Sequence, residues 1–167
     1  MKRLLVGALV VFVGGIIASA QSPTPPPPAC TAAEFRQFDF WLGKWNVRKP
    51  DGAIIGASEI TRESEGCAIR ENWTGGNGKH GMSINYYDAA AKRWHQDWVG
   101  GDGTILHLQG GIENGAMILS DHPNANSPTN RITWTPLSPK ELKQEWATSE
   151  DGGKTWTTAF VGVYERL

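Results

Sequence analysis

Residues 82–109 read MSINYYDAAAKRWHQDWVGGDGTILHLQ, and the fold can be inferred outward from them. They contain three short runs rich in β-branched and aromatic residues, at Met82–Tyr87, Trp94–Val99 and Thr104–Gln109. Between these runs lie two breaks, at 88–93 and 100–102, the second of them rich in Gly and Asp. Short β-prone runs separated in this way predict antiparallel strands that pair with their sequence neighbours.

The same pattern continues on both sides. The remaining predicted strands are Trp45–Lys49, Ile54–Arg62, Ala68–Thr74, Ala116–Ser120, Arg131–Thr135, Leu142–Thr148 and Trp156–Tyr164. About ten antiparallel strands with short connections would close into an up-and-down barrel, which leaves no exposed sheet edge. A two-sheet sandwich fits the pattern nearly as well, but we expect an all-β, calycin-like barrel.

One helical segment precedes the strands. Thr31–Phe40 has Thr31 as a predicted N-cap with Glu34 three residues later, which is a capping-box pattern. Two phenylalanines follow at helical spacing, and Gly43 predicts the end of the segment. We therefore expect a short N-terminal helix before the first strand.

The first twenty residues have the features of a secretory signal peptide. Lys2 and Arg3 are followed by an uncharged apolar run at 4–17, and Ala18-Ser19-Ala20 is a small-x-small cleavage pattern. The apolar run is too short to span a bilayer comfortably, although an uncleaved anchor is the alternative. The sequence predicts a signal peptide at 1–20, a Pro-rich linker at 21–29 and a single β-barrel domain at 30–167. The expected location is secreted or periplasmic.

The charge balance argues against two classes of partner. Removing residues 1–20 takes the formal net charge from −1 to −3, because that segment contains two basic residues and no acidic ones. Such a chain has no electrostatic footprint for nucleic acid or for an anionic membrane. We expect no nucleic-acid partner and no stable membrane insertion after removal of the signal.

The cysteines predict a cross-link. Cys30 and Cys67 both remain in the mature chain, and an even number of cysteines in an oxidising compartment favours a disulfide. Two free thiols are the alternative. Neither cysteine belongs to a CxxC pair, which argues against a structural zinc.

Several motifs resemble domain-of-unknown-function family 1579. They are FDFWLGKWNV at 38–47, ENWTG at 71–75, GMSINYYD at 81–88 and WHQDW at 94–98. The Gly-x-Trp at Gly43–Trp45 is also similar to the opening of lipocalins and calycins, in which the Trp closes one end of the barrel. The resemblance covers nearly the whole mature chain. It implies a calycin-like barrel and no particular activity, since the family carries no agreed one.

Strand alternation predicts the interior. His95 and Asp97 are titratable and belong outside, which turns the alternate residues of that strand inward. Extending this phase across the two predicted loops gives cross-strand partners, namely Tyr87 with Trp94, Asn85 with Gln96, Ser83 with Trp98, Leu108 with Trp94 and Leu106 with Gln96. With the same alternation on other strands, the predicted ligand-binding residues are Glu71, Trp73, Asn85, Tyr87, Trp94, Gln96, Trp98, Gln144 and Trp146.

This inner face is typical of a pocket, because aromatic walls surround a few amides and one carboxylate. The prediction is therefore an exported protein that binds a small, partly apolar molecule inside the barrel. One alternative is an isomerase or hydrolase that uses Glu71 as a general base. Another is a non-catalytic interaction module with a filled core, in which Asn85 and Gln96 satisfy each other. We expect a binding protein rather than an enzyme, and we predict no catalytic residues and no cofactor.

Two further motifs concern a metal site and a hairpin. In the predicted register His95 and His107 face each other beside Asp97, a set that could hold a metal, but no third ligand follows from the spacing and we predict none. Ser149-x-Asp151-x-Gly153-x-Thr155-Trp156 matches the Asp-box hairpin of sialidases and other β-propellers. A single copy cannot build a propeller, so it predicts only a locked turn.

Overall fold

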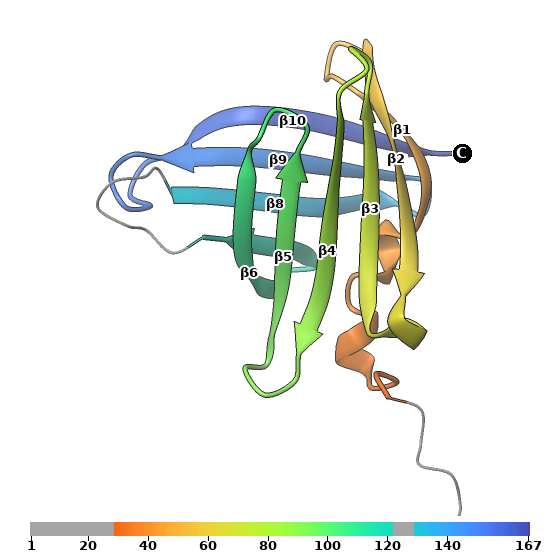
Figure 1. Cartoon of the computed structure of the whole chain (residues 1–167). Coiled ribbons are helices and arrows are strands. Elements are labelled where there is room, and N and C mark those ends of the chain that lie inside the picture. Colours follow the sequence, from red (N-terminus) through yellow and green to blue (C-terminus); the bar gives the residue numbers. More distant parts are fainter. Residues whose placement is uncertain (1–28, 122–128) are drawn as a thin grey trace, which may run out of the picture.

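The computed structural model describes residues 29–121 and 129–167, so the predicted signal peptide and nearly all of the linker lie outside the described residues. The described chain forms ten antiparallel strands in one closed barrel, in which each strand pairs with its sequence neighbours and β1 pairs with β10 (Figure 1). The strands are β1 (Gly43–Arg48), β2 (Ile54–Glu63), β3 (Ala68–Gly75), β4 (His80–Asp88), β5 (Arg93–Gly100), β6 (Ile105–Glu113), β7 (Ala116–Ser120), β8 (Thr129–Ser138), β9 (Glu141–Ser149) and β10 (Thr157–Arg166). The predicted barrel is confirmed, and the sandwich is not formed.

The N-terminal segment differs from the expected helix. It forms two 3₁₀ turns, η1 (Ala33–Arg36) and η2 (Asp39–Trp41), and the N-cap of η1 is Ala32 rather than Thr31. Phe38 lies between the turns with φ −102° and ψ 9°, and both Phe38 and Trp41 are fully buried. Tertiary packing of these rings overrides the local helical preference. Within 29–121 and 129–167, no helix is long and apolar enough to cross a membrane.

These turns close one end of the barrel. The Phe38 ring stacks on Trp41 with centroids 4.8 Å apart, and it meets Trp134 at 5.2 Å and Trp94 at 5.7 Å in edge-on contacts. All four rings are buried. Edge-on and offset contacts between aromatic rings add stability beyond the area they bury. This cluster fills the end of the barrel at which the orange N-terminal turns lie in Figure 1.

Trp45 and Arg166 fasten the turns to the barrel. The indole Nε1 of Trp45 donates to the Trp41 carbonyl at 2.8 Å, and the Arg166 guanidinium lies over the Trp45 ring at 4.1 Å. Arg166 also donates to the Phe40 carbonyl at 3.1 Å. Because Arg166 belongs to β10, these contacts join the last strand to the segment that precedes the first strand.

A disulfide adds a second attachment, as predicted. Cys30 and Cys67 are bonded, with a Cα–Cα distance of 5.0 Å. Cys67 follows the 3₁₀ turn η3 (Ser64–Gly66), and Arg36 donates to the Gly66 carbonyl at 3.0 Å. The N-terminal segment is therefore held against the start of β3 by one covalent and one polar contact.

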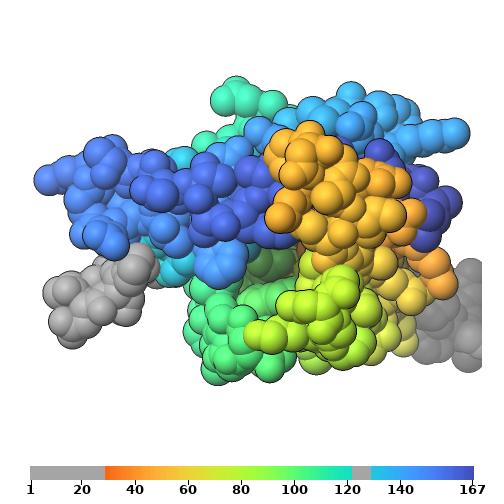
Figure 2. All heavy atoms as spheres, turned by 90° about the horizontal axis from the view of Figure 1, so that it is seen from above, coloured from red at the N-terminus to blue at the C-terminus, as the bar shows by residue number. Residues whose placement is uncertain are grey.

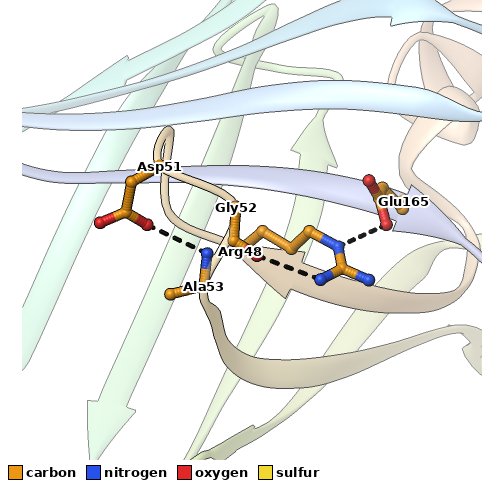
Figure 3. Close-up of polar contacts among 5 residues, drawn as sticks. All are labelled: Arg48, Asp51, Gly52, Ala53 and Glu165. Atoms are coloured by element: carbon orange, nitrogen blue, oxygen red, sulfur yellow. Dashed lines mark hydrogen bonds and ion pairs between the residues drawn. The ribbon is translucent and has the colours of Figure 1, made fainter.

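The β1–β2 hairpin lies at the other end of the barrel. On the outside of β1, Arg48 bonds Glu165 of β10 at 2.6 Å and the Gly52 carbonyl at 3.1 Å (Figure 3). The Asp51 carboxylate accepts from the Ala53 N–H at 3.0 Å, which is an Asx turn. These contacts shape the hairpin and tie the first strand to the last.

The Asp-box hairpin joins β9 to β10 and behaves as predicted. The Asp151 carboxylate accepts from the Thr155 hydroxyl at 2.7 Å and from the Lys154 and Thr155 N–H groups at 2.9 and 2.8 Å. Hydrogen bonds from Thr155 and Ser149 hold the pKa of Asp151 at about 2. Trp156 donates to the Gly153 carbonyl at 3.1 Å. The motif locks a turn on the outside of the barrel.

Candidate functional site

The barrel interior contains a cavity of about 200 Å³. Its lining residues are Glu71, Trp73, Gln96, Trp98, Leu106, Ile132, Gln144, Trp146, Phe160 and Tyr164. Six of the nine residues predicted to bind a ligand are among them. The lining combines apolar and aromatic walls with one carboxyl, two amides and one phenol, which is the composition typical of a small-molecule pocket.

Glu71 is held by hydroxyl groups from the strands on each side of β3. Ser58 of β2 donates to Oε1 at 2.8 Å, and Ser83 of β4 donates to Oε2 at 3.2 Å. All three side chains are buried and face inward because they occupy inward positions of neighbouring strands. The carboxyl therefore has a fixed position at the cavity wall.

The polar network continues away from the cavity. Asn85 donates to Ser83 Oγ at 3.0 Å and to the Ile69 carbonyl at 3.2 Å, and it accepts from Gln96 Nε2 at 2.7 Å. Asn85 is fully buried and is not part of the lining. The expected Asn85–Gln96 contact is present, but its role is to orient Gln96 and Ser83.

Burial dominates the electrostatics of Glu71. The side chain is only 3% exposed, and burial raises its pKa from 4.5 to about 7, against the opposing effect of the two serine hydroxyls. Arg70 pairs with Glu63 at 3.3 Å and Arg131 lies over Trp156 at 4.0 Å, so neither of these arginines neutralises Glu71. No Lys, Arg or His lines the cavity in the described part of the chain.

Tyr164 and Gln144 form the opposite polar group. The Tyr164 hydroxyl donates to Gln144 Oε1. Burial, together with the nearby charge of Glu71, keeps the pKa of Tyr164 well above its usual value. The phenol is therefore neutral, and its proton is engaged with Gln144.

Four aromatic side chains form the mouth of the cavity. Trp73, Trp98, Trp146 and Phe160 line the cavity and also a wider depression of about 640 Å³ at the hairpin tips. The tips of the β1–β2, β3–β4 and β5–β6 hairpins meet at this end, which Figure 2 views from above, and the Gly76 N–H bonds the Ile55 carbonyl at 2.8 Å. All four mouth rings are only partly buried. The cavity therefore opens to the outside between these four aromatic side chains.

Two glycines give the mouth rings their space. A Cβ at Gly56 would lie 2.6 Å from Trp73 Cη2, and a Cβ at Gly81 would lie 2.4 Å from Trp98 Cη2. Real Cβ atoms do not approach other atoms so closely, so each ring packs directly on glycine backbone. These two contacts fix the position of each indole ring relative to the cavity.

Besides Asn85, two other predicted ligand-binding residues lie outside the cavity. Trp94 is 1% exposed, contacts Phe38 and donates to Gln37 at 3.1 Å, while Tyr87 packs edge-on against Phe35 at 5.3 Å. Both face inward as predicted, but at the closed end. Alternation assigns a side chain to a face and carries no information about its depth along the barrel axis.

The β5–β6 register also differs from the prediction. Leu108 lies opposite Gln96 and Leu106 opposite Trp98, a shift of two residues. The β4–β5 register is as predicted. A shift of two leaves every side chain on its predicted face, whereas a shift of one would have inverted the strand.

The same shift removes the predicted histidine pair. Asp97 lies opposite His107, bonded to it at 2.6 Å, and His95 stacks on Tyr86 with centroids 5.2 Å apart. Across the described ranges, no group of three or more His, Cys, Asp or Glu residues is arranged to hold a metal ion.

Sequence reasoning missed several members of the site. Ser58 and Ile132 could have been found, since Glu59 and the polar neighbours of Ile132 mark the outward positions of clean alternations. Phe160 and Tyr164 lie on one face of β10 and Val161 lies on the other. All three are apolar or aromatic, so polarity does not tell the inner face from the outer face here. A bulge between Thr158 and Phe160 further hides the phase of this strand.

Comparison with known proteins adds no identification. No family model matches the chain, and no curated protein matches it. The likeness to family 1579 therefore stays a prediction.

Proposed function

We propose that this is an exported binding protein that holds one small, partly apolar molecule inside its lipocalin-like barrel. The observation that carries the proposal is the interior cavity of about 200 Å³, which has aromatic walls, a fixed carboxyl and a route to the outside. Closed barrels of this type enclose ligands when their interior is not filled by side chains.

The volume sets the size of the occupant. An apolar cavity of about 150 Å³ accommodates benzene, so a cavity of about 200 Å³ suits a single ring with a short substituent. In the described part of the chain the Gln96 side chain makes a single protein hydrogen bond, to Asn85. The rest of its amide is available to orient a bound molecule.

Export is supported by the chemistry of the chain. Residues 1–20 have the pattern of a signal peptide, and the Cys30–Cys67 disulfide fits an oxidising compartment. A carrier or sensor of small molecules outside the cytoplasm agrees with both features.

Native mass spectrometry of protein purified from its own host tests the proposal. We expect an added mass of a small molecule that is lost on denaturation. Leu106→Trp should abolish it, because Leu106 lines the cavity and the larger ring would fill it. Ile105→Trp is the matched control, since Ile105 is the preceding residue and is 60% exposed. Equal retention in both variants would place the molecule outside the barrel and contradict the proposal.

A second candidate function is catalysis with Glu71 as a general base. It is favoured by one observation, a buried carboxyl at the cavity wall whose pKa is about 7. Turnover of a bound molecule that disappears in Glu71→Gln, with binding retained, would establish it. Stable recovery of the unchanged molecule from the wild-type protein would instead support carriage.

A further inference from the structure

The cavity contains one ionisable carboxyl, and no Lys, Arg or His of the described chain lines the cavity with it. Glu71 is fixed at the wall, and the other lining residues are aromatic, aliphatic, amide or phenol. Resting on the proposed function, we propose that the natural ligand is a protonated amine carrying one ring, with its ammonium group on Glu71 and its ring against the mouth indoles.

The hydrogen bonds at Glu71 suit a carboxylate. Ser58 and Ser83 donate to different oxygens of the group, and donors on both oxygens stabilise the ionised form. A buried carboxylate without a cation is costly, and a ligand ammonium would supply the missing charge where no Lys, Arg or His lines the described cavity.

The remaining polar atoms also favour a donor ligand. Gln96 already donates to Asn85, and the Tyr164 proton is used on Gln144. Oxygen lone pairs on Gln96 and Tyr164 can accept from an ammonium group, whereas the amide donors left are the Gln144 N–H groups and the second N–H of Gln96. A ligand carboxylate would meet these acceptors and the charge of Glu71, so anions are disfavoured.

The aromatic mouth supplies the second half of the recognition. Trp73, Trp98 and Trp146 are partly buried around the same cavity. Indole faces attract cations, and the attraction is strongest when the cation is desolvated, as it would be beside Glu71. The same faces stack on an apolar ring, so a short chain between ring and nitrogen satisfies both ends of the site.

Ionisation of Glu71 gives the proposal a specific signature. Near neutral pH the empty site is about half protonated, because burial places the pKa of Glu71 at about 7. A bound ammonium requires the carboxylate, so binding at pH 7 should release about half a proton to the buffer. Tyr164 of β10 and Gln144 of β9 line the same cavity, and Ser58 of β2 and Ser83 of β4 bond Glu71 directly. The pKa of Tyr164 lies well above its usual value, and the other three side chains do not ionise in this range.

Other groups near the mouth need a control. Lys79, His80 and Asp102 line the outer depression and are exposed. His80 belongs to the outer depression and not to the cavity lining, so His80→Gln should leave the proton release unchanged. Loss of the release in His80→Gln would assign it to the rim and overturn the proposal.

Isothermal titration calorimetry with phenethylamine, phenethyl alcohol and phenylacetate is the test. In buffers of different ionisation enthalpy, phenethylamine should release about half a proton at pH 7, and its affinity should rise about tenfold from pH 6 to pH 8. The alcohol should bind more weakly with no release, and phenylacetate should bind weakest. Glu71→Gln should reduce the amine affinity on the order of 30-fold and leave the alcohol unchanged.

The outcomes separate this inference from the proposed function. Equal affinity for amine and alcohol without proton release would overturn the amine while leaving small-molecule binding intact. Failure of all three probes, together with a retained native mass in the wild-type protein, would do the same. If Glu71→Gln does not fold, the pH and buffer dependence of the wild-type protein decides the question alone.

Discussion

Both ends of this barrel contain several tryptophans. The ends differ in whether another chain segment packs between those tryptophans. At the closed end, Trp41, Trp94 and Trp134 are fully buried around Phe38, which the N-terminal turns insert between them. At the open end, Trp73 and its neighbours have no such insert and stay partly exposed around a cavity. A tryptophan of this barrel is either packed in the core or exposed to the cavity, according to whether another chain segment fills the space beside it.

Replacing one tryptophan at each end should give the largest measurable difference in stability between the two ends. Trp41→Ala removes a fully buried ring from a packed cluster and should lower the free energy of unfolding by about 3–5 kcal/mol. Trp98→Ala removes a partly buried ring beside an existing cavity, so its cost should be about 1–2 kcal/mol. Urea unfolding followed by circular dichroism measures both. Equal costs would mean that the mouth is as rigidly packed as the closed end.

Removal of the disulfide tests how the closed end is kept closed. The bond spans 37 residues, and Cys30→Ser with Cys67→Ser should lower the free energy of unfolding by about 2–4 kcal/mol. The loss should come with exposure of the Phe38 cluster and leave the open end unaffected. Thermal unfolding with and without reductant measures the first effect, and hydrogen exchange at each end measures the second. Increased exchange at the β3–β4 tip would contradict this division.

The pH dependence of stability should report on the open end. The pKa of Glu71 is raised from 4.5 to about 7 by burial, so the folded state holds a proton that the unfolded state loses. Stability from this group is complete below pH 4.5 and is lost as the pH rises through 7, by up to about 3 kcal/mol. Glu71→Gln should flatten the profile between pH 5 and pH 8. Parallel profiles for the two proteins would show that the carboxyl is solvated.

These contrasts also show what the sequence could predict. Charges on alternate positions reveal which face of a strand is inside, so alternation predicts that Glu71 and Trp98 face inward, and both line the cavity. Depth along the axis depends on the N-terminal turns, whose two bends arise from tertiary packing rather than local propensity. Alternation therefore predicts that Tyr87 and Trp94 line the cavity, although both pack against the N-terminal turns at the closed end, outside the lining. The β5–β6 register differs from the prediction by two residues because the loop covers 100–104. The length of a loop does not follow from the strand pattern alone.

The smallest loss of stability should come from replacing Gly81, the glycine that contacts the Trp98 ring. This variant tests directly whether the position of a mouth ring matters. A Cβ at Gly81 would lie 2.4 Å from Trp98 Cη2, so Gly81→Ala must displace the indole, at a cost of about 1–2 kcal/mol. Gly111→Ala is the matched control, because Gly111 is also on a strand and a Cβ there meets nothing within 4 Å. The displaced ring should change the tryptophan fluorescence and the rate of ligand entry in the first variant alone. Identical rates of ligand entry in the two variants would show that the Trp98 ring does not limit access to the cavity.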